Sequence, residues 1–449
     1  MTSLGPGASD GNASGLEMRE LLRRLYPICR SITGDGVRQT LALLQEVIPI
    51  EVHEVPTGTC VFDWTIPKEW NIRDAYVKNA RGERVIDFKR HNLHVVSYSV
   101  PVRAAMSLAE LRPHLHTLPG QPDLIPYRTS YYKEDWGFCL AHRQLQALPE
   151  GDYEVCIDSS LEPGHLTYGE LLVEGASQQE VLISCHCCHP SLADDNLSGL
   201  VVAAFLARRL ARISPRYSYR FLFIPGTIGA ITWLSLNEER TNAIRHGLVL
   251  TCLGDRGNFT YKKSRCGEAD IDVAVRHVLK HSAREHRIVD FSPYGYDERQ
   301  YCSPGFDLPV GCLMRSHHGE FAQYHTSADN LDFVDAASLA ESLEKLLAVV
   351  HVLEHDGTYV NLNPKCEPQL GKRGLYSATG GANIKPLELA MMWVLNLSDG
   401  TSSLLAIAER SGLPFALISD AATMLMQHQL LAPARPDTMP AQPASRAAQ

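Results

Sequence analysis

An apolar strand ends and a helix begins within the stretch Ser184-Cys-His-Cys-Cys-His-Pro-Ser-Leu-Ala-Asp-Asp-Asn-Leu-Ser-Gly199. His189 and the neighbouring pair Asp194 and Asp195 place one imidazole and two carboxylates on the connecting loop. Zinc in proteins is bound mostly by imidazole nitrogen, carboxylate oxygen or thiolate. The stretch therefore predicts one half of a metal site.

The other half is expected further along the chain. Asp255 follows an apolar run over residues 248–253, and His325 lies in the segment Tyr324-His-Thr-Ser-Ala-Asp-Asn330. Together with His189 and the Asp194/Asp195 pair, these residues predict a centre for one or two zinc ions. A carboxylate is missing at the strand end between the two halves, where the chain reads Pro225-Gly-Thr-Ile-Gly229.

Simpler interpretations exist for single residues of this set. Asp195 alone would serve as the N-cap of the following helix. Cys185, Cys187 and Cys188 invite a structural zinc site or a cysteine nucleophile, but they lack the separated pairs of a zinc knuckle, and neighbouring buried cysteines are more often core residues. We favour the metal site because four elements occur in this order, three of them at or near predicted strand ends.

Strands and helices alternate from residue 181 onward. Apolar runs predict strands over 181–185, 219–224 and 248–253, and helical spacing predicts helices over 197–209 and 228–236. This alternation predicts an α/β fold, in which a mostly parallel sheet is covered by helices on both faces. Ligands of such sheets bind beyond the carboxyl ends of the strands, where the candidate residues lie.

Changes in pattern along the chain predict its domains. Short β-type runs separated by turn residues follow the N-terminal helices, and three amphipathic helices over 387–395, 402–409 and 416–427 resemble a winged helix. We expect a disordered tail over 1–15, a catalytic domain over 16–52 and 169–372, an inserted β-rich domain over 53–168, a winged-helix-like domain over 373–431 and a second disordered tail over 432–449.

The composition and charge of the chain argue against nucleic acid and membranes as binding partners. The formal net charge of −9 on 449 residues gives no electrostatic reason to expect nucleic acid, and no run is long enough to span a membrane. Between Pro414 and Leu431 there is no Lys or Arg, so we favour packing or homo-oligomer contacts over DNA for the last helices. The N-terminal residues do not have the pattern of a secretory signal. The twelve cysteines are expected to be reduced thiols, and both observations predict a cytoplasmic protein.

These residues carry a resemblance to the co-catalytic zinc aminopeptidases. The chain more closely resembles a group of bacterial aminopeptidase-like proteins with an inserted β domain and a C-terminal winged helix. The segments that carry this likeness are Val61-Phe-Asp-Trp-Thr-Ile-Pro-Lys-Glu-Trp70, Tyr127-Arg-Thr-Ser-Tyr-Tyr132, Cys188-His-Pro-Ser191, Asp297-Glu-Arg-Gln-Tyr-Cys302 and Tyr324-His-Thr-Ser-Ala-Asp329. The resemblance implies that His189, Asp195 or Asp194, Asp255 and His325 are metal ligands.

The chain departs from this family pattern at Gly226. The resemblance implies a glutamate there that binds metal or acts as general base, and glycine can do neither; Gln323 and Asp194 are further expected departures. A positioned general base contributes about 10²–10⁴-fold to rate. Asp194 is one expected replacement for the lost carboxylate, and other glutamates are open to the same role, namely Glu238, Glu239, Glu298 and Glu320.

The sequence as a whole predicts a zinc-dependent hydrolase that acts on an amide bond of a small aminoacyl or peptide-like substrate. Asp194 and Glu298 are the catalytic candidates, and the substrate pocket is predicted to be lined by Tyr127, Arg128, Tyr296, Arg299 and Tyr324. Two alternatives stay open, a metal-binding protein without hydrolytic activity and a zinc-assisted cyclase or acyl transferase.

Overall fold

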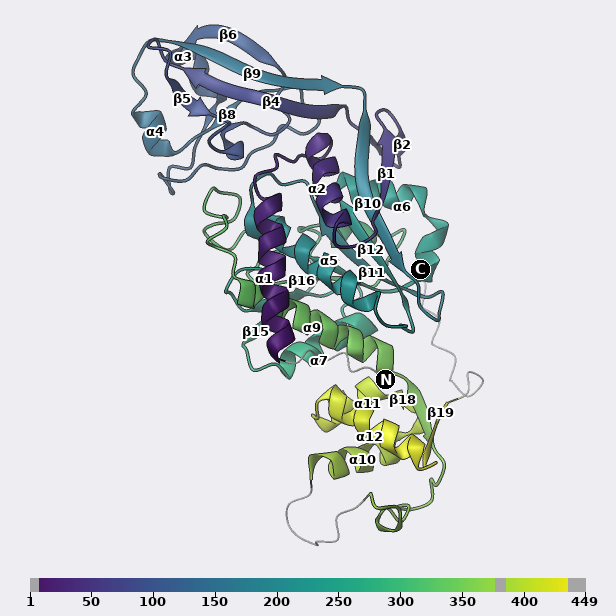
Figure 1. The fold of residues 1–449 in the computed structure, drawn as a ribbon. Coiled ribbons are helices and arrows are strands. Elements are labelled where there is room, and N and C mark those ends of the chain that lie inside the picture. The colour runs from purple at the N-terminus through teal and green to yellow at the C-terminus, as the bar shows by residue number, and fades with distance from the viewer. Residues whose placement is uncertain (1–7, 376–384, 435–449) are drawn as a thin grey trace. The chain divides into compact units, whose positions relative to one another are not determined.

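The structure, a computed structural model, describes residues 8–375 and 385–434. The chain divides into two compact units, one of residues 1–272 and 285–346 and the other of residues 273–284 and 347–449. The first unit holds a large sheet with its helices and a β-rich insertion, and the second holds the C-terminal helices (Figure 1).

An eight-stranded mixed sheet forms the centre of the first unit. Its strand order is β1-β10-β12-β11-β13-β16-β14-β15, and the pairs of β11 with β12 and β13, and of β13 with β16, are parallel. The strands are β1 (Glu51–Pro56), β10 (His165–Val173), β11 (Glu180–His186), β12 (Ser218–Ile224), β13 (Ile244–Leu250), β14 (Phe259–Lys262), β15 (His286–Val289) and β16 (Val310–Met314). The predicted α/β fold is confirmed.

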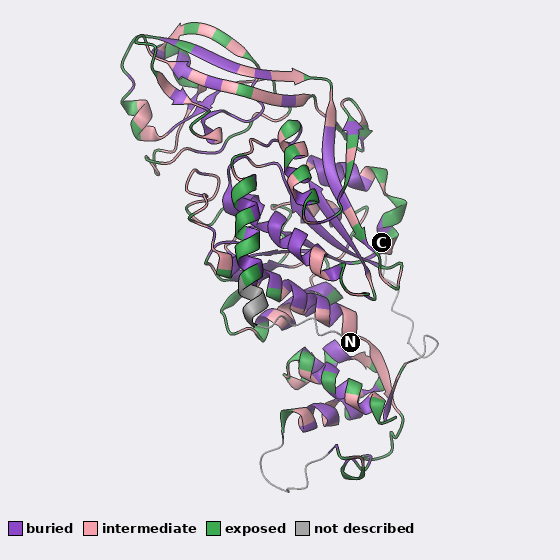
Figure 2. Cartoon of the chain, in the orientation of Figure 1, coloured by how far each residue is buried: buried purple, intermediate pink, exposed green. Residues whose placement is uncertain are grey.

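Helices cover both faces of this sheet. The hydroxyl of Ser184 on β11 lies 2.9 Å from that of Tyr301, whereas the thiol of the next residue, Cys185, donates to the carbonyl oxygen of Gly199 at 3.5 Å. Successive strand residues point to opposite faces, so α8 (Glu298–Tyr301) and α5 (Gly199–Leu210) lie on opposite sides. Figure 2 shows the central strands as almost entirely buried, which explains their continuous apolar runs.

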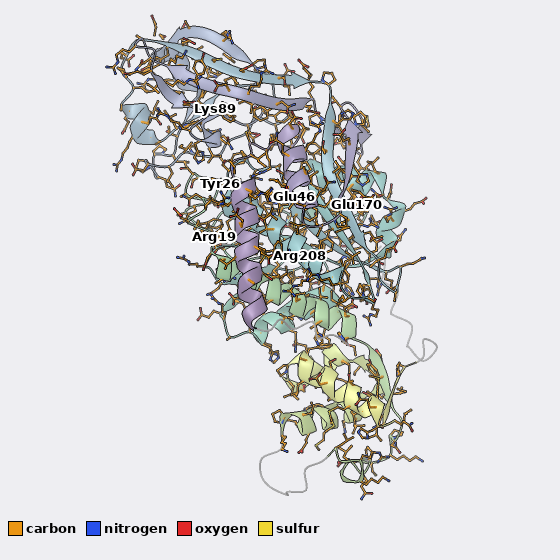
Figure 3. All side chains as sticks on the ribbon, in the orientation of Figure 1. Arg19, Tyr26, Glu46, Lys89, Glu170 and Arg208 are labelled. Atoms are coloured by element: carbon orange, nitrogen blue, oxygen red, sulfur yellow. The ribbon has the colours of Figure 1, made fainter. Side chains whose placement is uncertain are left out.

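The remaining helices of the first unit are α1 (Ala8–Leu25), α2 (Asp35–Gln45) and α6 (Ile228–Leu236), with the short segments η3 (Ala193–Ser198) and η4 (Glu239–Ala243). Two further helices, α7 (Asp270–Lys280) and α9 (Ala336–His355), each have residues in both units. Arg208 on α5 donates to Glu17 on α1 at 2.8 Å, and Arg24 donates to Glu46 at the same distance (Figure 3). These exposed ion pairs tie α1 to its neighbours at their solvent edge.

Residues 8–15 belong to α1 rather than to the predicted N-terminal tail; residues 1–7 lie outside the described part of the chain. A side chain at position 15 would not fit, because a Cβ there would lie 2.3 Å from the carbonyl oxygen of Ala336. Glycine therefore lets α1 approach α9 closely. The second predicted tail begins within β19 (Leu431–Pro433), and its residues from 435 onward are not described.

The β-rich insertion is built on a four-stranded antiparallel sheet of order β5-β4-β9-β6, joined to the large sheet through β9 and β10 (Figure 1). Its strands are β4 (Glu69–Lys78), β5 (Arg84–Asp87), β6 (Val102–Ser107) and β9 (Asp152–Glu162). Smaller elements complete it: β2 (Cys60–Val61), β3 (Trp64–Thr65), β7 (Leu115–His116), β8 (Phe138–Cys139), η1 (Asn92–His94), η2 (Arg112–His114), α3 (Leu108–Leu111) and α4 (His142–Gln146).

The second unit combines three helices with a small sheet. The helices predicted from periodicity are α10 (Pro386–Leu397), α11 (Leu404–Ser411) and α12 (Phe415–Gln427), and η5 (Gly371–Arg373) precedes them. A three-stranded sheet of order β18-β17-β19 packs with them, in which β17 is Thr358–Asn361 and β18 is Asp399–Ser403. None of the helices in the described ranges combines the length and apolar character needed to cross a membrane.

His246 on β13 makes the folded protein sensitive to acid. Burial lowers the pKa of His246 to about 4, and its Nδ1 has no hydrogen-bond partner. The unfolded chain takes up the proton near the usual pKa of about 6.5, so this histidine costs stability as pH falls from about 6.5 to about 4. When the pH falls from about 6.5 to about 4, the free energy of unfolding should decrease in both proteins. We expect this decrease to be about 3 kcal/mol smaller in His246→Phe than in the wild type. Urea denaturation at both pH values measures this difference, and equal losses in the two proteins would refute it.

Candidate metal centre

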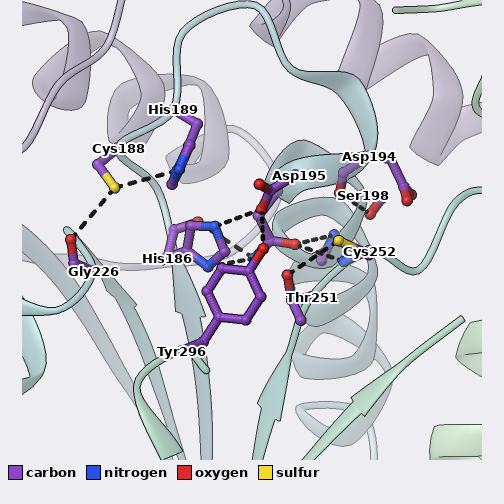
Figure 4. A network of polar contacts seen from close by, with 12 residues as sticks. His186, Cys188, His189, Asp194, Asp195, Ser198, Gly226, Thr251, Cys252 and Tyr296 are labelled. Atoms are coloured by element: carbon purple, nitrogen blue, oxygen red, sulfur yellow. Dashed lines mark hydrogen bonds and ion pairs between the residues drawn. The ribbon is translucent and has the colours of Figure 1, made fainter. Parts of the chain in front are cut away.

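His186, His189 and Asp195 come together at the carboxyl end of the central strand β11 (Figure 4). His186 is the last residue of β11, and His189 follows it on the loop that leads into η3. Arg30 holds this loop, because its Nε donates to the carbonyl oxygen of His189 at 3.1 Å. Asp195 lies within η3, where the carboxylate of Asp329 accepts its backbone N–H at 3.0 Å.

Asn196 fastens the turn that carries Asp195. Its side-chain nitrogen donates to the carbonyl oxygen of Leu250 at 2.9 Å, and its side-chain oxygen accepts the backbone N–H groups of Gly199 and Cys252 at 3.2 and 3.3 Å. The turn is thus bonded to both α5 and the end of β13. Such anchoring fixes the carboxylate of Asp195 without using its own oxygens.

Each carboxylate oxygen of Asp195 faces a different imidazole. Oδ1 lies 2.9 Å from Nε2 of His186, and Oδ2 lies 3.0 Å from Nε2 of His325. One ligand atom from each of His186, His189 and Asp195 lies within 4.8 Å of the others, and the ring of His189 is 5.2 Å from that of His325. A carboxylate that presents one oxygen to each of two imidazoles has the geometry of a bridging metal ligand.

Electrostatics keep these groups in the protonation states that metals require. Burial alone would raise the pKa of Asp195, but the imidazoles of His189, His186 and His325 hold it well below its usual value. Burial lowers the pKa of His189 to about 3. At neutral pH the site therefore offers an ionised carboxylate and a neutral imidazole, which are the ligand forms that bind zinc.

Aromatic rings pack against the three imidazoles of the site.

 Tyr296 stacks on His186 with ring centres 4.5 Å apart, and its hydroxyl donates to Oδ1 of Asp195 at 2.9 Å. Burial raises the pKa of Tyr296 well above its usual value, so this hydroxyl keeps its proton. Tyr324 stacks on His325 at 4.0 Å, and Tyr127 lies 5.0 Å from His189. Three of the five predicted pocket residues thus contact the imidazoles directly.

Two of the predicted metal ligands make other contacts. The carboxylate of Asp255 accepts the backbone N–H and the hydroxyl of Ser316 at 3.1 and 2.8 Å, and also the N–H of Gly257. Oδ1 of Asp194 accepts the N–H of Gly254 at 2.7 Å, whereas its Oδ2 is buried without a partner. Burial and then the charge of Asp255 raise the pKa of Asp194 well above its usual value. The carboxylates of these two acids are therefore bonded to backbone and to Ser316, outside the group of His186, His189 and Asp195.

The other predicted residues are dispersed. The carboxylate of Glu298 is bound by the ammonium of Lys262 at 2.7 Å, and Glu320 is bound by Arg287 at 2.6 Å. Arg128 is exposed, as are Glu238 and Glu239. Arg299 is half-buried, and its Nε has no hydrogen-bond partner.

Three residues near the centre were not predicted as site residues from the sequence. His186 could have been found, because it stands at the end of the strand and three residues before His189. Asp297 is buried, both of its carboxylate oxygens lack a hydrogen-bond partner, and burial raises its pKa to about 7. His318 lies 4.9 Å from the ring of Tyr296, and neither of its ring nitrogens has a partner. No local pattern marks Asp297 or His318, since their neighbours come from distant parts of the chain.

Comparison with known proteins finds relatives that are similar over nearly the whole chain. The chain is 54% identical over 423 residues to a Clostridium acetobutylicum protein, covering 94% of this chain and 97% of that protein, whose name assigns it provisionally to polysaccharide biosynthesis with an aminopeptidase-like domain. A crystal structure from the same organism, described provisionally as a peptidase, has a TM-score of 0.90 at 53% identity and covers 95% of this chain and 98% of its own.

More distant structures share the fold alone. A zinc aminopeptidase from Bacillus subtilis has a TM-score of 0.56 at 11% identity, covering 78% of this chain and 96% of its own. The predicted likeness to aminopeptidase-like proteins is thus confirmed. Residues 357–433 match a winged helix-turn-helix family, which confirms the winged-helix part of the fold. Residues 19–356 match the family described as Domain of unknown function (DUF4910), and the chain belongs to that family.

Proposed function

We propose that this protein is a zinc-dependent hydrolase of the aminopeptidase type that cleaves an amide bond of a small aminoacyl or peptide-like substrate. The observation that carries the proposal is the carboxylate of Asp195, which presents one oxygen to His186 and the other to His325 beside His189. The zinc aminopeptidase that shares the fold supports the choice of metal and reaction class.

The donor set fits zinc. Imidazole nitrogens and a carboxylate oxygen are its usual ligands at catalytic sites, and His186, His189, Asp195 and His325 would hold it. Bound zinc would polarise the substrate carbonyl and activate a water molecule. The stacked rings of Tyr296 and Tyr324 fix the orientation of the two outer imidazoles, and the hydroxyl of Tyr296 holds a proton at Oδ1 of Asp195.

Gly226 favours a second candidate function. The family resemblance implies a glutamate base at this position, and glycine has no proton acceptor in its side chain. A protein that lost its base without replacement would keep the metal and bind a ligand through the same residues. This non-hydrolytic function is the alternative against which the hydrolase is tested.

Metal content and turnover separate the two functions. We expect purified protein supplied with zinc to retain one or two ions per chain by elemental analysis and to hydrolyse aminoacyl 4-nitroanilides. N-acetylated amino sugars belong in the same substrate panel, because the name of the Clostridium relative refers to polysaccharide biosynthesis. Zinc without turnover on either substrate class would favour the binding protein, and a lack of zinc would refute both functions.

We further propose that the C-terminal unit makes protein contacts and does not read DNA. The exposed residues of α12 carry no positive charge, being Ala416, Asp420, Thr423 and Gln427. Binding to nucleic acid rests on Lys and Arg near phosphates and weakens steeply with salt. Fluorescence anisotropy with duplex DNA should therefore show no tight, salt-dependent binding between about 50 and 200 mM salt. A steep salt dependence of measurable affinity would contradict this proposal.

The thiols support a reducing compartment. All twelve cysteines are free, and most are buried within the core. Oxidising compartments favour disulfides in secreted chains. We therefore retain the cytoplasm as the proposed location.

A further inference from the structure

Asp297 is a buried acid whose carboxylate oxygens make no hydrogen bond in the fold. Only 1% of its surface is exposed, yet neither carboxylate oxygen has a hydrogen-bond partner. It stands at the N-cap position of α8, where an aspartate commonly accepts a backbone N–H, but its side chain accepts none. Buried polar groups are nearly always hydrogen-bonded, so an orphan carboxylate points to a partner that binds during function.

The orphan carboxylate faces Gly226. A Cβ built on Gly226 would lie 3.4 and 3.5 Å from the two carboxylate oxygens of Asp297, and 3.1 Å from the Cβ of His186. The carboxylate oxygens of Asp297 therefore lie in front of residue 226, next to His186 of the metal centre. A longer side chain at 226 would have to share this space with the carboxylate.

A positive φ is not the reason for glycine at this position. Gly226 is not among the glycines with positive φ, which are the positions where a side chain would be strained. A methyl group there would meet only one close atom, the Cβ of His186. The two carboxylate oxygens of Asp297 would lie at ordinary contact distance from that methyl group, so glycine leaves the space in front of them free of a side chain from residue 226.

We propose that Asp297 supplies the general base that the chain lacks at Gly226. This inference rests on the hydrolase function proposed above. A carboxylate oxygen of Asp297 takes one proton from the attacking water while the water oxygen forms a bond to the amide carbon. The same proton then passes to the amine nitrogen as the carbon–nitrogen bond breaks, which yields a carboxylic acid and a free amine and restores the Asp297 carboxylate.

The surrounding contacts suit a fixed base. The next residue, Glu298, is bound to Lys262 at 2.7 Å, and the hydroxyl of Tyr301 lies 2.9 Å from that of Ser184 on β11. Both contacts hold the single turn of α8 against the sheet. Asp297 thereby keeps its position through its neighbours while its own oxygens remain available.

Asp297→Asn tests the proposal, because it keeps the shape of the side chain and removes its basicity. We expect kcat to fall about 10²- to 10⁴-fold with unchanged zinc content. Adding Gly226→Glu to this variant should restore at least about tenfold of the activity, since it places a carboxylate in the same space. The matched control Gly226→Gln has the same size without a base and should restore nothing.

Different results would refute the role of Asp297 and the hydrolase function. Full activity in Asp297→Asn, or equal rescue by Gly226→Gln and Gly226→Glu, would refute a base at Asp297. If the zinc-loaded wild type turns over no substrate, the hydrolase function fails, and binding of acetohydroxamate measured by calorimetry decides on Asp297. We then expect Asp297→Asn to bind about 10- to 100-fold more weakly, the value of a hydrogen bond to a charged group. Equal affinity, or no binding to either protein, would refute the inference.

Discussion

Asp195→Asn is expected to abolish zinc binding and, with it, all turnover. The variant removes the carboxylate charge that lies between the imidazoles of His186 and His325. Loss of residues that only support a metal ligand already costs about 10–100-fold in affinity or activity, so loss of the central carboxylate should cost about 10²-fold or more. Elemental analysis after dialysis against a defined zinc concentration measures the effect.

The variant should fold, which keeps the result interpretable. Burial keeps His189 neutral at ordinary pH, so the substitution leaves no unpaired charge on that residue. The asparagine oxygen still accepts from the hydroxyl of Tyr296, which lies 2.9 Å from Oδ1 in the wild type. Circular dichroism of the zinc-free proteins should therefore be the same for variant and wild type.

Asp255→Asn is the matched control. Asp255 is as buried as Asp195, with 1% and 0% exposure, and the sequence assigns both to the metal. In the structure Asp255 binds Ser316 and the backbone instead, so its variant should retain zinc. Equal loss of zinc in both variants would show that Asp255 is a ligand and would contradict the set of His186, His189, Asp195 and His325.

The position of one strand end explains why Asp255 lies apart from His186, His189 and Asp195. The apolar run predicts a strand over 248–253, which would put Asp255 just beyond the sheet. In the structure β13 ends at Leu250, and the backbone N–H of Cys252 already donates to Asn196 in the turn at the site. Asp255 therefore lies five residues past the strand end, where local sequence no longer determines the direction of the chain.

The residues predicted correctly as neighbours share a different property. His189 and Asp195 follow one buried strand within a few residues, so strand direction alone brings them to the carboxyl edge of the sheet. His325 comes from far along the chain, and its placement was implied by the family motif rather than by periodicity. Local pattern thus suffices for groups attached to a strand end, and long-range partners require the fold.

Adjacent acids on α8 show the limit most clearly. Glu298 is predicted from the sequence as a catalytic candidate and its neighbour Asp297 is not, although a single turn of helix carries no periodicity that could tell which one faces the metal centre. The distinction comes from Lys262, which lies 36 residues earlier in the chain and binds Glu298. Only the folded sheet, in which β14 carries Lys262, shows which of the two acids is held in an ion pair.

Glu298→Leu is expected to destabilise the fold by about 3–5 kcal/mol, because it leaves the ammonium of Lys262 buried without its counter-charge. The side chains of Lys262 and Glu298 are 2% and 0% exposed, so solvent screens this pair little. The ammonium also donates to the carbonyl oxygen of Tyr294 at 2.7 Å and lies 5.5 Å from the centre of the Phe291 ring, and neither contact neutralises the charge. Urea denaturation measures the loss of free energy of unfolding.

The double variant Lys262→Met and Glu298→Leu shows whether that loss comes from the isolated charge. Replacing a buried ion pair by apolar residues of similar volume is often neutral or stabilising, whereas removing one partner is not. The double variant should therefore recover most of the stability lost in Glu298→Leu, and its coupling energy should clearly exceed the limit for independent sites of about 0.5 kcal/mol. If it is no more stable than the single variant, Glu298 acts through something other than Lys262. A catalytic role for Glu298 would then regain support, because the ion pair with Lys262 is what holds its carboxylate away from such a role.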